Sequence, residues 1–206
     1  MSKTILSIGA GYVGVPTMAV CAEHCPEYKF ICADYNIELI ERLNSDHLPL
    51  YEPGLETLLG KVKNINLFFT SDIDTAIRSA QIIFVSVCTP TKTYGIGANR
   101  SCDLSYFESV ARKIRDVSEE YTVIVEKSTV PVGTGVHMKI LDANCREVCY
   151  DVASNPEFLA EGTAVNDLEK PYRVLIGCNQ SETSQFATQE VIDLYQHWVE
   201  KKDHCN

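Results

Sequence analysis

The chain has 206 residues and a formal charge of −10, so it is acidic and long enough for one substantial core. The charge argues against nucleic acid or an anionic membrane as a partner, because both are themselves negative. We expect a cytoplasmic protein, since no apolar run has the length of a membrane span and no signal peptide is recognisable. Nine cysteines without C-x-x-C or zinc-finger spacing indicate free thiols rather than disulfides or a metal site.

The first predicted elements are a strand over 5–8, a helix after it, and a second strand over 29–34. The first strand runs into a turn with the pattern G-x-G-x-x-G. Its residues are Gly9, Ala10, Gly11, Tyr12, Val13 and Gly14. The first glycine permits a tight turn, the second leaves room for a pyrophosphate, and the third lets the helix pack closely on the sheet. The helix N-terminus then directs N–H groups and the positive end of its dipole at the phosphates.

Asp34 ends the second strand about twenty residues after the last glycine of the turn. A carboxylate there accepts hydrogen bonds from both ribose hydroxyls, and its charge repels a 2′-phosphate. The glycine pattern alone also fits an ordinary turn between two core elements. Together with the flanking strand, helix and acid it predicts a dinucleotide site that prefers NAD to NADP.

Strands and helices continue to alternate along the chain, apart from a two-proline turn over 47–55 and a loop over 92–101. We expect helices over 37–43, 55–62, 72–80, 104–117, 136–143 and 181–195, and strands over 66–70, 82–87, 121–126, 148–153 and 173–177. The expected helix caps are Ser71 or Asp72, Asp103 and Ser181. The continuous Ile/Val/Phe run at 82–87 is typical of a strand buried on both faces. The pattern predicts one doubly wound, mostly parallel α/β domain over 1–206, with a closing helix and tail from about residue 181.

Three predicted strands end in polar or acidic segments. They are Val87, Cys88, Thr89, Pro90 and Thr91 after 82–87; Ser128, Thr129 and Val130 after 121–126; and Glu157, Phe158, Leu159, Ala160 and Glu161 after 148–153. Because the carboxyl ends of parallel strands share one edge, we expect these exits to meet a ligand beside the glycine turn. A partly desolvated carboxylate there would have a raised pKa suited to proton transfer. From the residues alone, 88–91 also fits a plain turn, Thr129 a helix N-cap, and Glu157 a helix-start carboxylate.

Five ordered motifs over nearly the whole chain resemble the amino-terminal half of the UDP-glucose 6-dehydrogenases, in the UDP-glucose/GDP-mannose dehydrogenase family. They are the turn 9–14, Tyr-Glu-Pro-Gly-Leu at 51–55, Thr-Pro-Thr-Lys-Thr-Tyr-Gly at 89–95, Glu-Lys-Ser-Thr-Val-Pro-Val at 126–132, and Asn-Pro-Glu-Phe-Leu-Ala-Glu-Gly at 155–162. The Thr-Lys-Thr-Tyr-Gly form resembles the animal and plant branch more than the bacterial one. The resemblance implies a Rossmann-like domain.

The resemblance also implies an activity, the NAD-dependent, four-electron oxidation of the C6 alcohol of UDP-glucose to give UDP-glucuronate, in a homo-oligomeric enzyme. It implies that the glycine turn and Asp34 hold NAD, with 89–91 and Thr129 near the nicotinamide. The residue matching Glu157 would be a general base or water-orienting acid, so Glu157 and Thr129 are the expected catalytic residues. Residues 158–161 would line the sugar or cofactor contact.

The sequence departs from the family pattern at Leu39, where an arginine is usual, at Cys88, where an asparagine is usual, and at Val15, where a glycine is common. Leu39 removes a positive donor from an anion site, which would weaken NAD binding by about 1–3 kcal/mol. The family's catalytic cysteine lies in a Gly-Gly-Ser-Cys segment beyond position 206, so we do not expect this chain alone to complete the reaction.

Three hypotheses follow from the resemblance. The chain is the NAD domain of a UDP-glucose dehydrogenase, or a shortened, inactive NAD-binding relative that associates with the full-length enzyme. The third is another NAD-dependent nucleotide-sugar dehydrogenase, acting on UDP-N-acetylmannosamine or GDP-mannose. Sugar specificity in the family is set mainly outside the part that this chain resembles.

Overall fold

The structure is a computed structural model that describes residues 2–93, 102–130, 150–177 and 182–200. Several sequence predictions fall outside these ranges. They are the tip of the loop over 92–101, the helix over 136–143, the first two residues of the strand over 148–153, and the cap at Ser181.

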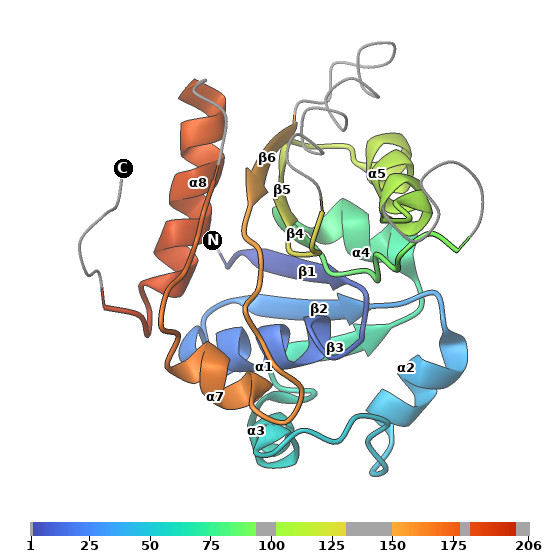
Figure 1. The fold of residues 1–206 in the computed structure, drawn as a ribbon, viewed down its shortest axis with the longest axis vertical. Coiled ribbons are helices and arrows are strands. Elements are labelled where there is room, and N and C mark those ends of the chain that lie inside the picture. The colour runs from blue at the N-terminus through green and yellow to red at the C-terminus, as the bar shows by residue number, and fades with distance from the viewer. Residues whose placement is uncertain (1, 94–101, 131–149, 178–181, 201–206) are drawn as a thin grey trace.

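Six parallel strands form one sheet in the order β3-β2-β1-β4-β5-β6. They are β1 (Thr4–Ile8), β2 (Lys29–Ala33), β3 (Leu67–Thr70), β4 (Ile82–Val85), β5 (Thr122–Glu126) and β6 (Tyr150–Ser154). The order reverses between β1 and β4, which is the point at which doubly wound sheets bind ligands. The predicted doubly wound, Rossmann-like fold is confirmed (Figure 1).

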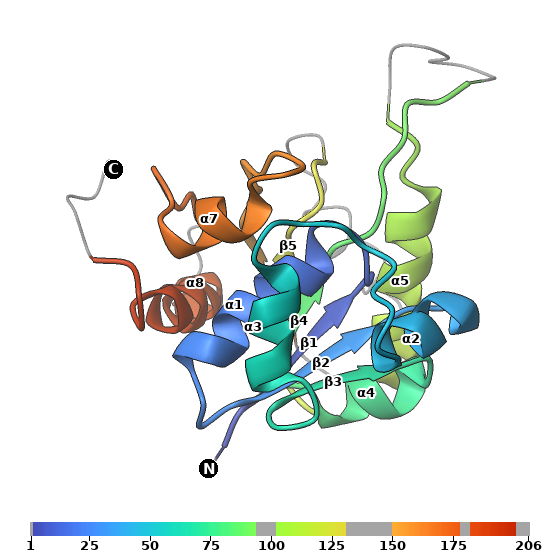
Figure 2. The ribbon, with the colours of Figure 1, turned by 90° about the horizontal axis from the view of Figure 1, so that it is seen from below.

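Helices cover both faces of this sheet (Figures 1 and 2). They are α1 (Gly14–His24), α2 (Ile37–Asn44), α3 (Leu55–Val62), α4 (Ile73–Ser79), α5 (Ser105–Val117), α7 (Ala164–Glu169) and α8 (Glu182–Tyr195). One buried cluster joins α1, α3 and α8 to alternate residues of the strands, such as Phe30 and Phe84. A second joins α4 and α5 to the strand residues that point the other way, such as Ile83 and Ile124. Strands buried on both faces account for the continuous apolar runs in the sequence.

A side-chain cap fixes the start of α4, whereas the N-cap residue of α5 is Leu104, which has no side-chain capping bond, and Asp103 lies one residue before it. The Asp72 carboxylate accepts a hydrogen bond from Thr75 N at 3.1 Å, which decides between the two caps expected for α4. Asp103 accepts from Ser105 N at 3.0 Å at the start of α5, one residue later than expected. Hydrogen bonds from the Thr75 side chain and backbone lower the pKa of Asp72, and those from the Ser105 backbone and side chain lower the pKa of Asp103, because they stabilise the ionised form.

The strand predicted over 173–177 was wrong. Within this segment only Gly177 is paired, and it lies antiparallel to Ser154, with N–O distances of 2.7 and 2.8 Å. The Leu175 carbonyl accepts instead from the Asn155 side chain at 2.8 Å. The Asn155 side-chain amide therefore takes the place of the next backbone hydrogen bond that a paired strand would make. The segment pairs with β6 at Gly177 alone and does not join the sheet as a strand.

The short helix α7 was not predicted. Its six residues are too few for a clear period, and its N-cap residue, Thr163, makes no capping hydrogen bond through its side chain. The carboxylate that meets its N-terminus belongs to Glu52, more than one hundred residues earlier in the chain. A cap so distant in the sequence cannot be predicted from the residues next to the helix.

Candidate functional site

The three glycines of the turn 9–14 are required for different reasons. Gly9 has φ +108°, and a Cβ there would lie 2.4 Å from the Ser86 carbonyl oxygen. A Cβ at Gly14 would lie 2.0 Å from the Gly9 oxygen, so the helix could not approach the turn. A Cβ at Gly11 would meet no protein atom within 4 Å. The space over Gly11 is open, as the predicted pyrophosphate site requires.

The N-terminus of α1 and the end of β2 complete the dinucleotide cradle. No side chain caps α1 and no acidic residue lies in its first turn, so nothing in the helix competes with an anion for its N–H groups. The Asp34 carboxylate lies against the turn, accepting from Ala10 N and Asn36 N, each at 2.9 Å. A carboxylate offers about four acceptor positions, so two remain for hydroxyl groups.

The departures from the family pattern have clear structural consequences. Val15 is fully buried in the core, so its side chain takes no space from the turn. Leu39 packs against the same core, and it leaves this side of the cradle without the positive charge expected there. Cys88 is an exposed free thiol.

The exits of β4, β5 and β6 meet at one edge, as expected from the topology. Thr89 Oγ1 donates to the Thr129 carbonyl at 2.9 Å, and Ser128 Oγ donates to the Val87 carbonyl at 2.7 Å. The Asn155 N–H donates to the Glu126 carbonyl at 2.9 Å. Gly9 lies directly beneath Ser86 on the neighbouring exit. The glycine turn and the polar exits therefore share one rim of the sheet.

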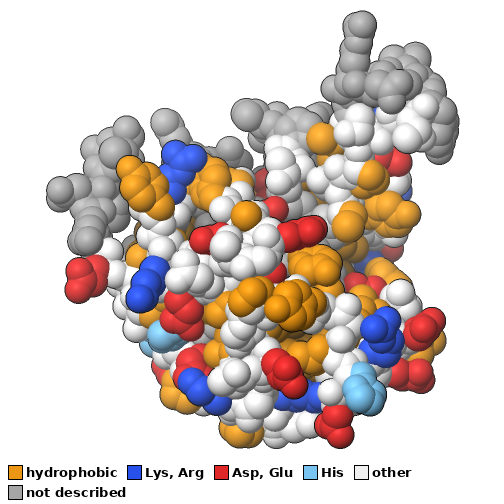
Figure 3. All heavy atoms as spheres, turned by 60° about the horizontal axis from the view of Figure 1, so that its bottom comes forward, with side chains coloured by type: hydrophobic (Ala, Val, Ile, Leu, Met, Phe, Trp, Pro, Cys, Tyr) orange, Lys and Arg blue, Asp and Glu red, His pale blue; other side chains and the backbone are white. Residues whose placement is uncertain are grey.

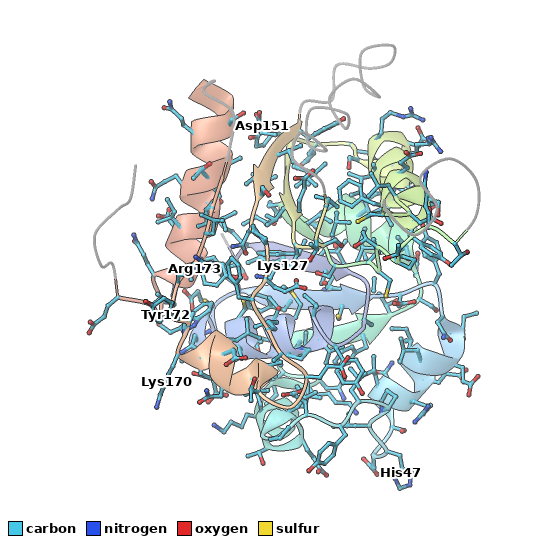
Figure 4. All side chains as sticks on the ribbon, in the orientation of Figure 1. His47, Lys127, Asp151, Lys170, Tyr172 and Arg173 are labelled. Carbon is cyan, nitrogen blue, oxygen red and sulfur yellow. The ribbon has the colours of Figure 1, made fainter. Side chains whose placement is uncertain are left out.

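A cavity of about 470 Å³ opens beside this rim, between the β5 and β6 exits, α7 and α8. It is lined by Lys127, Asn155, Pro156, Glu157, Phe158, Leu159, Asp167, Leu168, Lys170, Pro171, Tyr172, Arg173, Val174 and Tyr195. Lys170, Tyr172 and Arg173 lie along the segment between α7 and α8, and Lys127 lies nearer the sheet (Figure 4). The Arg173 guanidinium lies over the Phe158 ring, 4.2 Å from its centroid.

A buried polar network forms the floor of the cavity. The Lys127 ammonium, only 3% exposed, donates to Asn155 Oδ1 and to the Tyr195 hydroxyl, both at 3.1 Å. Tyr195 in turn donates to Asn155 Oδ1 at 2.9 Å. No carboxylate of the described chain lies within ion-pair distance of the ammonium, whose charge lowers the pKa of its neighbours Glu157 and Tyr195 against the larger effect of burial.

Two carboxyl groups at the exits of β5 and β6 are desolvated, and of these two Glu157 is the one that lines the cavity. Burial raises the pKa of Glu157, against the opposing effect of the Lys127 ammonium, and Glu157 Oε2 is buried without a hydrogen-bond partner. The direction is the one expected from the sequence. Burial also raises the pKa of Glu126 to about 7, and its Oε1 likewise has no partner. Glu157 is therefore suited to exchanging a proton with a group in the cavity.

The structure brings only some of the predicted site residues to the cavity. Glu157, Phe158 and Leu159 line it, whereas Ala160 and Glu161 are exposed beyond it and Thr129 is exposed at the rim. Sequence reasoning missed Glu52, Lys127, Asn155 and Tyr195 as site residues. Two signals were available for Lys127 and Asn155: they directly follow strands β5 and β6, and they lie in the motifs at 126–132 and 155–162. Tyr195 has only helical spacing in the sequence.

The comparisons with known proteins agree with this geometry. Residues 3–199 match the model of the UDP-glucose/GDP-mannose dehydrogenase family, NAD binding domain. The chain belongs to this family. It is 50% identical over 196 residues to UDP-glucose 6-dehydrogenase 5 of Oryza sativa subsp. japonica, and 48% identical over 202 residues to UDP-glucose 6-dehydrogenase of Rattus norvegicus. The UDP-glucose dehydrogenase structure from Pyrobaculum islandicum is similar with a TM-score of 0.81 at 31% identity, covering 97% of this chain and 45% of that one.

As a family member, the chain carries the NAD-binding domain, and NAD is its cofactor. The matches to the rice and rat relatives include 95% and 97% of this chain, respectively, but only 41% of the length of each relative. Among the described residues, no helix has the length and apolarity to cross a membrane, and no cluster of three or more acidic, His or Cys side chains is arranged to hold a metal. Basic side chains on the face shown in Figure 3 are scattered rather than gathered into one surface.

Proposed function

We propose that this chain supplies the NAD site and one wall of the sugar-nucleotide site for the oxidation of UDP-glucose to UDP-glucuronate. The observation that carries the proposal is the common rim: the open glycine turn and the cavity holding a desolvated carboxyl group lie side by side at one sheet edge. The identity of about one half to plant and animal UDP-glucose 6-dehydrogenases supports the choice of sugar nucleotide. We propose further that residues 1–206 act as one domain, in a cytoplasmic homo-oligomer.

In this proposal the chain's own residues bind, orient and exchange protons. The amides at the start of α1 hold the diphosphate, and Asp34 accepts from the adenosine ribose hydroxyls. Thr89, Thr91 and Thr129 border the nicotinamide side, together with Val87, Cys88 and Pro90. Bound at these residues, NAD would supply the hydride acceptor for oxidation at C6. Glu157 removes a proton or orients water, while Phe158, Leu159, Ala160 and Glu161 border the sugar nucleotide.

A second candidate function is binding without turnover. It uses only what the described residues hold, the open glycine turn and Asp34 of the NAD cradle. On this proposal the chain binds NAD and associates with a full-length enzyme. A GDP-mannose dehydrogenase from Pseudomonas aeruginosa is also structurally similar, with a TM-score of 0.79, so another nucleotide sugar is the third candidate.

Calorimetric titration with NAD and NADP tests the cofactor site. We expect NAD to bind at least about tenfold more tightly, a difference of about 1.4 kcal/mol. Asp34→Asn should remove most of this preference, because the amide carries no charge to repel a 2′-phosphate. Asp46→Asn is the matched control, since it removes one exposed acid away from the turn. Equal affinities for both cofactors in the wild-type chain would contradict the proposed role of Asp34.

Titration with UDP-glucose, with and without NAD, tests the second ligand and separates the candidate functions. Binding of UDP-glucose but not GDP-mannose supports the proposed substrate. We expect no sustained NADH formation by the isolated chain. Sustained turnover in a purified sample would show that these residues suffice for the reaction.

A further inference from the structure

The segment 51–55 is a motif that the dinucleotide site and the cavity leave unexplained. Tyr51 is 85% exposed, yet the adjacent Glu52 is only 5% exposed. The Glu52 carboxylate accepts two backbone hydrogen bonds, from Ala164 N to Oε1 at 2.7 Å and from Gly162 N to Oε2 at 2.9 Å. An ionised carboxylate forms stronger hydrogen bonds than a neutral acceptor, so this is a firm contact between distant parts of the chain.

The two donors belong to the end of the segment that borders the cavity. Gly162 has φ +90° and lies just before α7, whose N-terminus has no capping bond from its own Thr163 side chain. The Glu52 carboxylate therefore supplies the cap that the local sequence lacks. Its charge is also favourable at a helix N-terminus.

The turn that carries Glu52 is itself fixed. The Glu52 carbonyl accepts from Leu55 N at 3.1 Å, and Leu55 is buried in the core at the start of α3. Gly54 has φ +84°, a conformation that favours glycine, and it lies beside α7, where an added Cβ would be 3.6 Å from Val165 Cγ1, an ordinary contact distance. The turn is thus a rigid support for the carboxylate.

The segment 157–161 is consequently held at both ends. At its start, Asn155 is bonded to Lys127, Tyr195 and the Leu175 carbonyl. At its end, Glu52 holds Gly162. Few residues remain between the two anchors, so releasing one of them frees the position of Glu157.

We propose that Glu52 is a positioning residue, which fixes the far end of the 157–161 segment and thereby keeps the Glu157 carboxyl group in the cavity wall. Its effect on a reaction rests on the function proposed above, whereas its effect on the position of Glu157 does not. The motif at 51–55 is then part of the site although it lies outside the cavity.

Two substitutions separate position from charge. Glu52→Gln keeps the shape but offers one oxygen to two N–H groups and turns its own NH₂ towards one of them. Glu52→Asp keeps the charge but is one methylene too short to reach both amides. Glu56→Gln is the matched control, because it removes an exposed acid from the first turn of α3, four residues away.

Amide hydrogen exchange gives the first measurement. We expect Gly162 and Ala164 to exchange at least tenfold faster in both Glu52 variants, with no change in the β1 and β4 amides. Carbon-13 NMR of the glutamate carboxyl groups gives the second, with Glu157 assigned through Glu157→Gln. Burial raises the pKa of Glu157 in the wild type, so release of the segment should move it down towards its ordinary value.

The outcomes are distinct. A purely structural role would lower global stability but leave the titration of Glu157 in the folded chain unchanged, and that result would overturn the proposal. So would exchange at Gly162 and Ala164 no faster than in the Glu56→Gln control. If Glu52→Gln does not fold, Glu52→Asp carries both measurements. Neither measurement uses NAD or UDP-glucose, so failure of the proposed function leaves this test intact.

Discussion

The glycine turn and the cavity lie on one rim but are built from different ranges of the sequence. Most contacts that shape the turn join residues 9–14 to their own strand and helix and to Asp34, and one, at Gly9, is made with Ser86 on the neighbouring exit of β4. The cavity wall depends on Glu52, Lys127, Asn155 and Tyr195, which span most of the chain. The cofactor cradle therefore depends mainly on residues that are close in sequence, whereas the cavity wall depends on contacts across most of the chain.

The two regions also differ in the physical forces that constrain them. Around the turn the constraint is steric, because a single added carbon would overlap backbone atoms. Around the cavity it is electrostatic, because the buried Lys127 ammonium opposes the effect of burial on the Glu157 carboxyl group in a medium of low polarity. Substitutions at Gly9 and Gly14 should therefore lower stability strongly, and those at the cavity should change titration behaviour.

The largest expected effect is at Gly14. In Gly14→Ala the added Cβ would lie only 2.0 Å from the Gly9 carbonyl oxygen, so the turn or α1 must move. We expect a loss of about 3 kcal/mol or more in the free energy of unfolding, or failure to fold. Urea denaturation followed by circular dichroism measures it.

Gly11→Ala is the matched partner within the same motif. Its Cβ meets no protein atom, so we expect stability within about 0.5 kcal/mol of the wild type and NAD affinity reduced about tenfold. Similar losses of stability in both variants would show that the open space over Gly11 is not reserved for a ligand.

Glu126→Gln should change how stability depends on pH. Burial raises the pKa of Glu126 to about 7 in the folded chain. Protonation of this group therefore contributes stability that is fully present below the ordinary glutamate pKa and is lost as the pH rises through 7. At pH 8 the glutamine variant should be more stable than the wild type, by at most about 3 kcal/mol.

The difference between the two proteins should shrink towards pH 5, and urea denaturation at several pH values measures it. Glu120→Gln, an exposed acid just before β5, is the control and should show no such trend. A wild-type stability that stays constant relative to Glu126→Gln between pH 5 and 8 would contradict the burial of the charge.

The glycine turn and the cavity also differ in how well the sequence predicts them. The glycine turn, Asp34 and the strand exits were predictable because each lies next to a strand whose apolar run is unmistakable, and parallel topology brings strand ends together. The Asp72 cap was predictable for the same local reason. The family resemblance added the expected identities of the site residues.

The rest was hidden because its causes are remote in sequence. The 173–177 segment has the composition of a strand, but the Asn155 side chain takes the place of its backbone partner. Helix α7 depends on Glu52 for its N-terminal cap. The burial of Lys127 could not be predicted from its neighbours in sequence, because it depends on Tyr195 of the closing helix α8.

Lys127→Met tests the electrostatics of the cavity, with a smaller expected effect than the substitutions above. The ammonium opposes the effect of burial on Glu157, so its removal should raise the pKa of Glu157 further. Carbon-13 NMR of the carboxyl group measures this. Lys170→Met is the control, because that lysine lines the same cavity but is exposed and screened by water. Equal shifts in the two variants would show that burial of Lys127 has no special effect.

The smallest expected effect is at the contact between Arg173 and Phe158. A guanidinium 4.2 Å from a ring centroid gains from the negative face of the ring, but Phe158 is 50% exposed, so water competes for the charge. A double-mutant cycle with Arg173→Met and Phe158→Leu should give a coupling of about 0.5–1 kcal/mol. The Lys29 ammonium lies farther from the Phe68 ring, at 5.4 Å, so the same cycle there should give less. A coupling at Arg173 no larger than at Lys29 would mean that the stacked contact contributes no more than a distant charge, and that the anchors at Asn155 and Gly162 alone hold the cavity wall.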